Sequence, residues 1–191
     1  GFLDVVAYTG TGSTLNLNHN LGVTPEMILV KNRDSARDWQ VYHDDVYGSG
    51  GTDYVLTLNS SVAREDLSIF DSPTATQFTV KSSLATVNTS GDDYIAFLFA
   101  TVAGVSKVGT YSGTGSDVNV DCGFTSGARF VLAKRVDSSG DWYVWDSERG
   151  IVAGNDPYLL ISGAAAEVTN TDYIDPLSSG FTITSNAGSD L

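Results

Sequence analysis

Two short aromatic segments contain the residues of this 191-residue chain best suited to hold a sugar ring. DWQVYHD begins at Asp38, and DWYVWDS begins at Asp141, 103 residues later. Side chains alternate between the two faces of a strand, so Tyr143 and Trp145 share one face. Adjacent aromatic rings on an exposed face would offer a sugar apolar area and polar tips. We therefore select Tyr143 and Trp145 as ligand-binding candidates. The corresponding residues of the first segment, Gln40 and Tyr42, are further ligand-binding candidates.

The opposite face of these segments carries a tryptophan and a valine in both copies. An unchanged pair of large apolar residues is typical of a core position, so we predict that this face is buried. The other face then forms either an exposed sugar platform or a contact with a neighbouring chain or the second sheet. The predicted core residues are Trp39, Val41, Trp142 and Val144.

The loops before the two tryptophan segments each contain two aspartates, whose carboxylates are the hard oxygen ligands that calcium prefers. They lack the dense D-x-D-x-D-G spacing of a dedicated calcium loop. Aspartate before glycine or serine is also common turn chemistry. We predict no metal and no cofactor. If calcium binds, the candidates are Asp34, Asp38, Asp137 and Asp141.

No catalytic motif accompanies the two histidines, His19 and His43. The chain has no G-x-S-x-G, H-E-x-x-H or C-x-x-C spacing. YTGTGS and YSGTGS are glycine-rich, but no G-K-[ST] and no helical pattern follows them, which indicates a hairpin turn. We predict that the protein is not an enzyme.

Composition narrows the possible partners. Twenty-three acidic residues against ten basic ones give a net charge of −13. Such a chain has no cationic surface for nucleic acid or anionic membranes, and no apolar run approaches the roughly 20 residues of a membrane span. Cys122 is the only cysteine, so no disulfide can form within the chain, which suits folding in a reducing cytosol.

The sequence contains two similar copies of one pattern, offset by 103 residues. VAYTGTG (6–12) recurs as GTYSGTG (109–115), and ILVKNRDSARDWQVYHD from Ile28 recurs as VLAKRVDSSGDWYVWDS from Val131. YVLTLN at Tyr54 parallels YLLISG at Tyr158, one residue out of step. Short runs rich in Val, Ile, Thr, Tyr and Phe between turn residues indicate strands. We predict an all-β fold of two tandem β-sandwich or jelly-roll-like repeats, over residues 1–103 and 104–191.

The first copy ends in DYIAFLFA (93–100), which is apolar at successive positions and is therefore expected to be covered on both faces. Its counterpart would begin near position 196, beyond Leu191, so the second repeat is expected to lack its last strand. The chain could be cut from a longer protein, another chain could donate the strand, or the halves could share one sandwich. We favour a fragment within an oligomer.

Several motifs occur in a fixed order: Tyr-x-Gly-x-Gly at Tyr8, Gly-x-x-Pro at Gly22 leading to Lys31, Trp39, and a closing Gly-x-x-Tyr at Gly91. In this order they resemble a domain of tail-fibre and virion structural proteins of bacteriophages, notably marine ones. The second copy departs from the pattern, with Thr125 in place of Gly22 and without the closing strand. These motifs are architectural, and no catalytic residue can be carried over from them.

The resemblance implies a noncatalytic virion module near the host-contacting end of a fibre. Its partners would be further copies of itself in a homotrimer, other virion proteins and possible host surface glycans. Its location would be the virus particle, after assembly in the host cytoplasm. The alternative is a carbohydrate-binding β-sandwich module of a secreted polysaccharide-active protein. A depolymerising tailspike enzyme is a third hypothesis.

Overall fold

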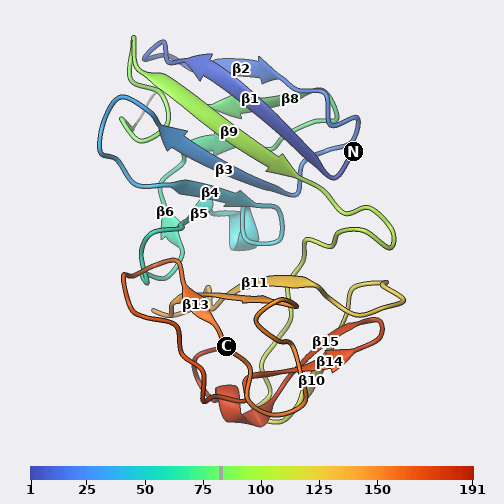
Figure 1. Ribbon diagram of the computed structural model, residues 1–191. Helices are drawn as coiled ribbons and strands as arrows, with labels where there is room; N and C mark the ends of the chain where they lie inside the picture. Colours follow the sequence, from blue (N-terminus) through green and yellow to red (C-terminus); the bar gives the residue numbers. More distant parts are fainter. Residues whose placement is uncertain (82–83) are drawn as a thin grey trace. The chain divides into compact units, whose positions relative to one another are not determined.

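The computed structural model describes residues 1–81 and 84–191, and it confirms the all-β prediction (Figure 1). These residues form fifteen β-strands and two short 3-10 helices, η1 (Ser49–Gly51) and η2 (Ser185–Ala187). The chain divides into two compact units. Unit 1 comprises residues 1–58 and 64–102, and unit 2 comprises residues 59–63 and 103–191. None of the described helices is long and apolar enough to cross a membrane.

Unit 1 contains a six-stranded antiparallel sheet and a three-stranded one. The larger sheet has the order β1-β9-β3-β4-β5-β6, and the smaller has the order β2-β8-β7. The strands of the larger sheet are β1 (Leu3–Thr9), β9 (Asp93–Phe99), β3 (Met27–Asn32), β4 (Gln40–His43), β5 (Tyr54–Thr57) and β6 (Glu65–Asp66). Those of the smaller sheet are β2 (Leu15–Asn18), β8 (Gln77–Val80) and β7 (Phe70–Asp71).

The core of unit 1 combines side chains from both of its sheets. Tyr8 and Tyr94, from adjacent strands of the larger sheet, stack with ring centroids 5.1 Å apart. Tyr8 also meets Phe78 of the smaller sheet edge to face at 6.4 Å, and Tyr42 meets Phe70 in the same way at 6.0 Å. Edge-to-face and offset aromatic pairs add to the apolar area that they bury. These rings therefore hold the two sheets together.

The glycine-rich segment after β1 crosses from one sheet to the other, so it is not the hairpin that its sequence predicts. A Cβ atom at Gly10 would lie 2.1 Å from the backbone oxygen of Thr89, so only glycine fits there. The buried Asn88 accepts a hydrogen bond from the Thr11 N–H at 2.8 Å and donates one to the Ser13 oxygen at 2.6 Å. The crossing is thus held by backbone contacts and one amide side chain, and it presents no phosphate-binding helix.

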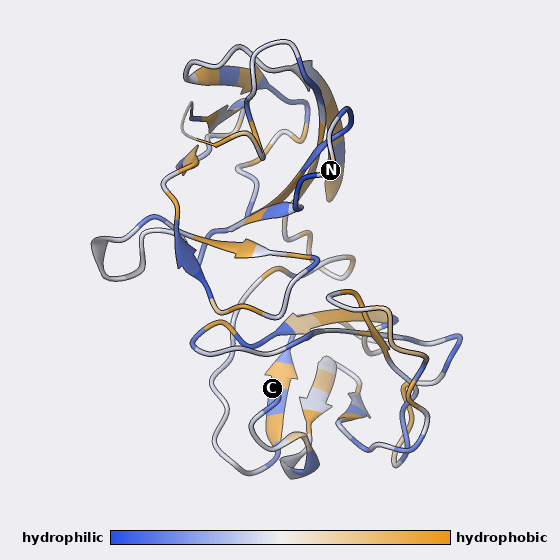
Figure 2. Cartoon of the chain, turned by 90° about the vertical axis from the view of Figure 1, so that its left-hand side faces the viewer, coloured by the Kyte–Doolittle hydropathy of each residue, from blue (hydrophilic) through white to orange (hydrophobic). Residues whose placement is uncertain are grey.

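Unit 2 contains two antiparallel sheets of three strands each, with the orders β10-β15-β14 and β11-β12-β13. Its buried cluster draws on both sheets, and Figure 2 shows the apolar residues concentrated mainly in strands. The first sheet is formed by β10 (Val118–Asp121), β15 (Gly180–Ile183) and β14 (Ile174–Leu177). The second is formed by β11 (Phe130–Lys134), β12 (Trp142–Asp146) and β13 (Leu159–Leu160).

The register of the strands corrects one detail of the sequence comparison. Val41 of β4 lies opposite Leu56 of β5, and Val144 of β12 lies opposite Leu159 of β13. Both members of the second pair follow the first by 103 residues. The one-residue slip inferred from the matching tyrosines is therefore absent from the paired strands, where the offset stays constant.

The unit boundaries differ from the predicted division at one segment. Residues 59–63, which lie inside the first sequence repeat, belong to unit 2. There the Gly140 N–H donates a hydrogen bond to the Ser61 oxygen at 2.8 Å. The segment 106–112, which corresponds to β1, contains no strand.

Candidate functional site

The aromatic residues selected for sugar binding in unit 2 lie in its core. Trp145 is fully buried and Tyr143 is 5% exposed. Their rings stack at 5.5 Å, and Tyr158 meets both edge to face at 5.1 and 5.8 Å. Burial raises the pKa of Tyr143 well above its usual range. The prediction of an exposed aromatic platform at Tyr143 and Trp145 is therefore wrong, because these rings are buried and pack against each other and against Tyr158.

The corresponding residues of unit 1 are buried as well. Tyr42 is fully buried, with Tyr47 5.0 Å from its ring and Phe70 6.0 Å from it. Gln40 is 3% exposed, and its Oε1 atom has no hydrogen-bond partner among the described residues. Neither side chain can contact a dissolved glycan, so this part of the platform is also corrected.

The tryptophan and valine face is buried too, as predicted, but it does not form the main cores. Val41, Trp142 and Val144 are at most 7% exposed, yet they lie outside the two core clusters. Trp39 is half-buried, with its ring 6.2 Å from that of Phe97. The predicted burial of the tryptophan and valine face is therefore confirmed for Val41, Trp142 and Val144. The error concerns the opposite face, which was expected to be exposed and which contributes Tyr42, Tyr143 and Trp145 to the core clusters.

Three of the four aspartates proposed for calcium form hydrogen bonds or ion pairs with other residues of the chain, and the fourth is exposed. Asp34 accepts a hydrogen bond from the Asp93 N–H at 2.6 Å, Asp137 pairs with Arg135 at 2.7 Å, and Asp141 accepts one from the Ser162 hydroxyl at 2.7 Å. Asp38 is exposed. No group of three or more acidic, histidine or cysteine residues suited to a metal occurs in the described part of the chain. Asp34 and Asp141 thus contact residues far away in the sequence, and Asp137 pairs with a residue of its own loop.

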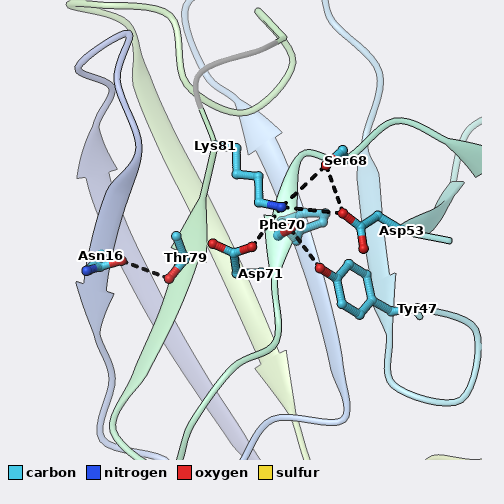
Figure 3. A network of polar contacts seen from close by, with 8 residues as sticks. All are labelled: Asn16, Tyr47, Asp53, Ser68, Phe70, Asp71, Thr79 and Lys81. Carbon is cyan, nitrogen blue, oxygen red and sulfur yellow. Dashed lines mark hydrogen bonds and ion pairs between the residues drawn. The ribbon is translucent and has the colours of Figure 1, made fainter. Parts of the chain in front are cut away.

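A polar network in unit 1 centres on Lys81, a residue that the sequence analysis did not select (Figure 3). Its Nζ atom lies 2.7 Å from a carboxylate oxygen of Asp71 and 3.4 Å from one of Asp53. Ser68 donates a hydrogen bond to Asp53 at 2.8 Å, and its φ of 44° is the only positive value of a described non-glycine residue. Strain of this kind persists where surrounding contacts determine the backbone.

The electrostatics of this network favour a structural role. The hydrogen bond to Asp71 raises the pKa of Lys81, so its amine stays protonated at neutral pH and is not a nucleophile. The hydrogen bond from Ser68 lowers the pKa of Asp53. Each charged group thus has an opposite partner, and the network joins β7 to the loops beside it.

One carboxyl group in unit 2, that of Asp156, is buried in surroundings that disfavour its charged form. Asp156 is fully buried, and one of its oxygens accepts a hydrogen bond from the Val152 N–H at 2.8 Å. The other oxygen has no partner that meets hydrogen-bond geometry in the described structure. Burial, followed by the charges of Asp172 and Asp175, raises the pKa of Asp156 to about 6. Ionisation of this group therefore costs unit 2 stability at neutral pH.

The most extended candidate for a functional surface is the outer face of β1, β9 and β3. Along it, residues from the three strands lie side by side in rows, and all but one are apolar. Leu3 is 41% and Val5 47% exposed, while the residues from β9 and β3 are half-buried. We call this the outer apolar surface. Its rows are Leu3, Phe99 and Met27, then Val5, Phe97 and Leu29, then Ala7, Ile95 and Lys31.

Within the described residues, the hollow at the C-terminal end of unit 2 is too small for an organic ligand. A hollow lined by Gly113, Gly115, Thr184 and Leu191 has a volume of about 10 Å³, room for about one water molecule. Ligand pockets are typically some 300–1,000 Å³. The candidate site is therefore a surface. The unbroken run of apolar residues in β9 indicates such a surface, because a strand that is apolar on both faces needs two covers.

The chain is an all-β protein in which aromatic residues contribute to the cores of both units. Over residues 1–190 it matches the family described as Domain of unknown function (DUF7483), and it belongs to that family. Comparison with curated proteins and with solved structures gave no match.

Replacement of Trp145 tests whether this residue belongs to the core. We expect Trp145→Ala to lower the free energy of unfolding of unit 2 by about 3–5 kcal/mol, because it removes a fully buried ring. Urea denaturation followed by far-UV circular dichroism measures the change. Phe130→Ala, on the neighbouring strand and 62% exposed in the parent, is the control and should cost less than about 1 kcal/mol. Equal stability of Trp145→Ala and the parent would contradict the assignment.

The carboxyl group of Asp156 predicts a pH dependence. Its folded pKa of about 6 lies above the ordinary value of 3.8. The folded chain therefore binds this proton more tightly than the unfolded chain, and the resulting stabilisation is lost as the pH rises through 6. Asp156→Asn should be about 1–3 kcal/mol more stable than the parent at pH 7.5, relative to their difference at pH 4. A difference in unfolding free energy that stays constant between these pH values would refute the prediction.

Proposed function

We propose that the chain is a noncatalytic structural module of a virus particle, of the tail-fibre type, that assembles with further copies of itself as a homotrimer. The outer apolar surface is the observation that carries this proposal. The order of motifs from Tyr8 to Tyr94, which resembles that of phage virion proteins, supports the location.

The composition of β9 explains why this surface calls for a partner. Its inward residues Tyr94, Ala96 and Leu98 are fully buried, whereas the outward residues Ile95 and Phe97 are only half-buried. The prediction that both faces are covered is thus met on one face. Large contiguous apolar patches are uncommon on monomers and typically mark interaction surfaces. Packing of copies against this face would supply the second cover.

We further propose that the two units are duplicated β-sandwich modules. Equivalent hydrogen bonds recur with the offset of 103. Thr79 donates to Asn16, and Thr182 donates to Asn119, both at 2.8 Å. Lys31 donates to the Arg37 oxygen and Lys134 to the Gly140 oxygen, both at 2.5 Å. Conserved side-chain contacts at one spacing support a common ancestral unit, although the jelly-roll form of the prediction has no further support.

Attachment to a host glycan stays a prediction from the family resemblance, without assigned residues. The aromatic side chains selected for it are buried. The structural role therefore stands by itself, and receptor binding would need a different surface.

Substitution of Val5 tests the assembly surface. We expect the parent chain to sediment with three times the 20.2 kDa of one chain. Val5→Lys should shift it toward the monomer, because a buried interface would have to desolvate the ammonium group. The matched control is Val23→Lys, which introduces the same charge at a residue 44% exposed and outside the outer apolar surface, compared with 47% for Val5. A parent that sediments as a monomer at tens of micromolar would overturn the assembly proposal.

The proposed location is tested on virus particles. Mass spectrometry of particles purified from the virus whose genome encodes the chain should find its peptides in amounts comparable with other fibre proteins. Antibodies against the chain should label the fibres in electron micrographs. Peptides present in the infected-cell lysate but missing from purified particles would exclude a virion protein.

A further inference from the structure

Four buried side-chain oxygen atoms of unit 2 have no hydrogen-bond partner in the described structure, and all four belong to residues between 156 and 175. They are Oδ2 of Asp156, Oγ1 of Thr171, Oδ1 of Asp172 and Oδ1 of Asp175. Buried polar atoms are nearly always bonded, so a group of exceptions calls for a bound water molecule or ion. None of the ion pairs among the described residues includes any of these three aspartates. A water molecule would satisfy the oxygens but would leave their charge without a partner.

The backbone brings these side chains together. The Asp156 N–H donates a hydrogen bond to the Thr171 oxygen at 2.7 Å, so the loop that contains Asp156 lies against the segment that leads into β14. The side chain of Asp156 is fully buried. Burial raises its pKa, and the negative charges of Asp172 and then Asp175 raise it further, so both carboxylates lie near that of Asp156.

The carboxylates of Asp156 and Asp172 are each held by hydrogen bonds that leave one oxygen atom available. Oδ1 of Asp156 accepts from the Val152 N–H at 2.8 Å, and the Ile174 N–H also lowers the pKa of this carboxyl group. Oδ2 of Asp172 accepts from the side chain of Asn186 at 3.1 Å. Carboxylates that ligate a metal are commonly oriented by hydrogen bonds of this kind.

The arrangement also limits the number of carboxylates in one site. Three acidic side chains of the described structure do not converge on a single point. Asp172 has the larger effect on the pKa of Asp156, and it adjoins Thr171 in the sequence. The set that a cation can reach therefore consists of two carboxylates and one hydroxyl group, with Asp175 as a further negative charge beside them.

We propose that Asp156, Thr171 and Asp172 bind a calcium ion. Calcium takes six to eight oxygen ligands in flexible geometry, and water or backbone oxygens can complete a set of three side chains. Magnesium demands a nearly ideal octahedron and suits this irregular set less well. With three side-chain ligands we expect a weak site, with a Kd of about 0.1–1 mM. The bound ion would fasten the loop of Asp156 to the start of β14. This inference does not depend on a role in a virus particle.

Calorimetric titration of the full chain with CaCl2 tests the site, at pH 7.5 after treatment with EDTA. The parent should bind about one calcium ion with a Kd in the range given. Asp156→Asn and Asp172→Asn should each weaken binding by about tenfold or more, because each removes a charged ligand while keeping the shape of the side chain. Asp156→Asn also removes a buried charge, so lost binding does not come from a destabilised fold. A parent that shows no saturable binding up to about 10 mM calcium would overturn the proposal.

Two further variants separate a built site from attraction to an acidic surface. Asp137→Asn removes the same charge from an aspartate of unit 2 whose side chain is 68% exposed, and it should keep the Kd within about twofold. Thr171→Val removes only the hydroxyl ligand and should weaken binding by about threefold or more. Equal losses in Asp137→Asn and Asp156→Asn would show that calcium only screens the negative surface, and the proposal would fail.

Thermal unfolding gives a second readout, followed by tryptophan fluorescence, since two of the three tryptophans lie in unit 2. Calcium at about 5 mM should raise the Tm of the parent by a few degrees, because a ligand that binds only the folded state stabilises it. The same concentration of MgCl2 should raise it less. Asp156→Asn should show no difference between the two salts. A calcium-specific rise of the same size in the parent and in Asp156→Asn would place the ion elsewhere and overturn the assignment.

Discussion

Unit 1 depends on the insertion of β9 between β1 and β3. Seven residues of β9 pair with β1 and six with β3, so this strand alone joins the first strand of the chain to the rest of the larger sheet. It is also apolar on both faces, which no other strand of the sheet is over such a length. Contacts between residues 62 to 96 positions apart thus decide whether unit 1 forms, at a cost in loop-closure entropy that the strand must recover by burial.

The hydroxyl group of Tyr94 extends the influence of β9 beyond the sheet. It accepts hydrogen bonds from the Thr89 N–H and the Asn32 side chain, and it donates one to the Ala85 oxygen. Asn32 in turn accepts from the backbone N–H of Asp34 and Ser35. One buried phenol therefore fixes the loop before β9 and the loop after β3. The aspartate loop that resembled a calcium site is shaped by this network.

The sequence was sufficient to predict an all-β fold, because alternation and turn residues are local signals. It could not assign the faces of β4 and β12. Both faces carry large side chains there, Val41 and Tyr42 in one strand and Val144 and Trp145 in the other, and periodicity does not tell which face meets the core. The prediction that the differing residues are exposed fails because residues of a core also differ where their neighbours differ. Tyr143 stacks on Trp145 and meets Tyr158, whereas Tyr42 packs against Tyr47 and Phe70.

The acidic charge of the chain affects how copies can associate through the outer apolar surface. Copies that carry −13 each repel one another, but salt at physiological concentration screens this repulsion beyond about 8 Å. Association therefore requires a contact that buries apolar area or pairs backbone groups at short range. Lys31 is the only charged residue of the outer apolar surface. Association through this surface would bury apolar area, but apolar contacts alone would not fix the orientation of the partner.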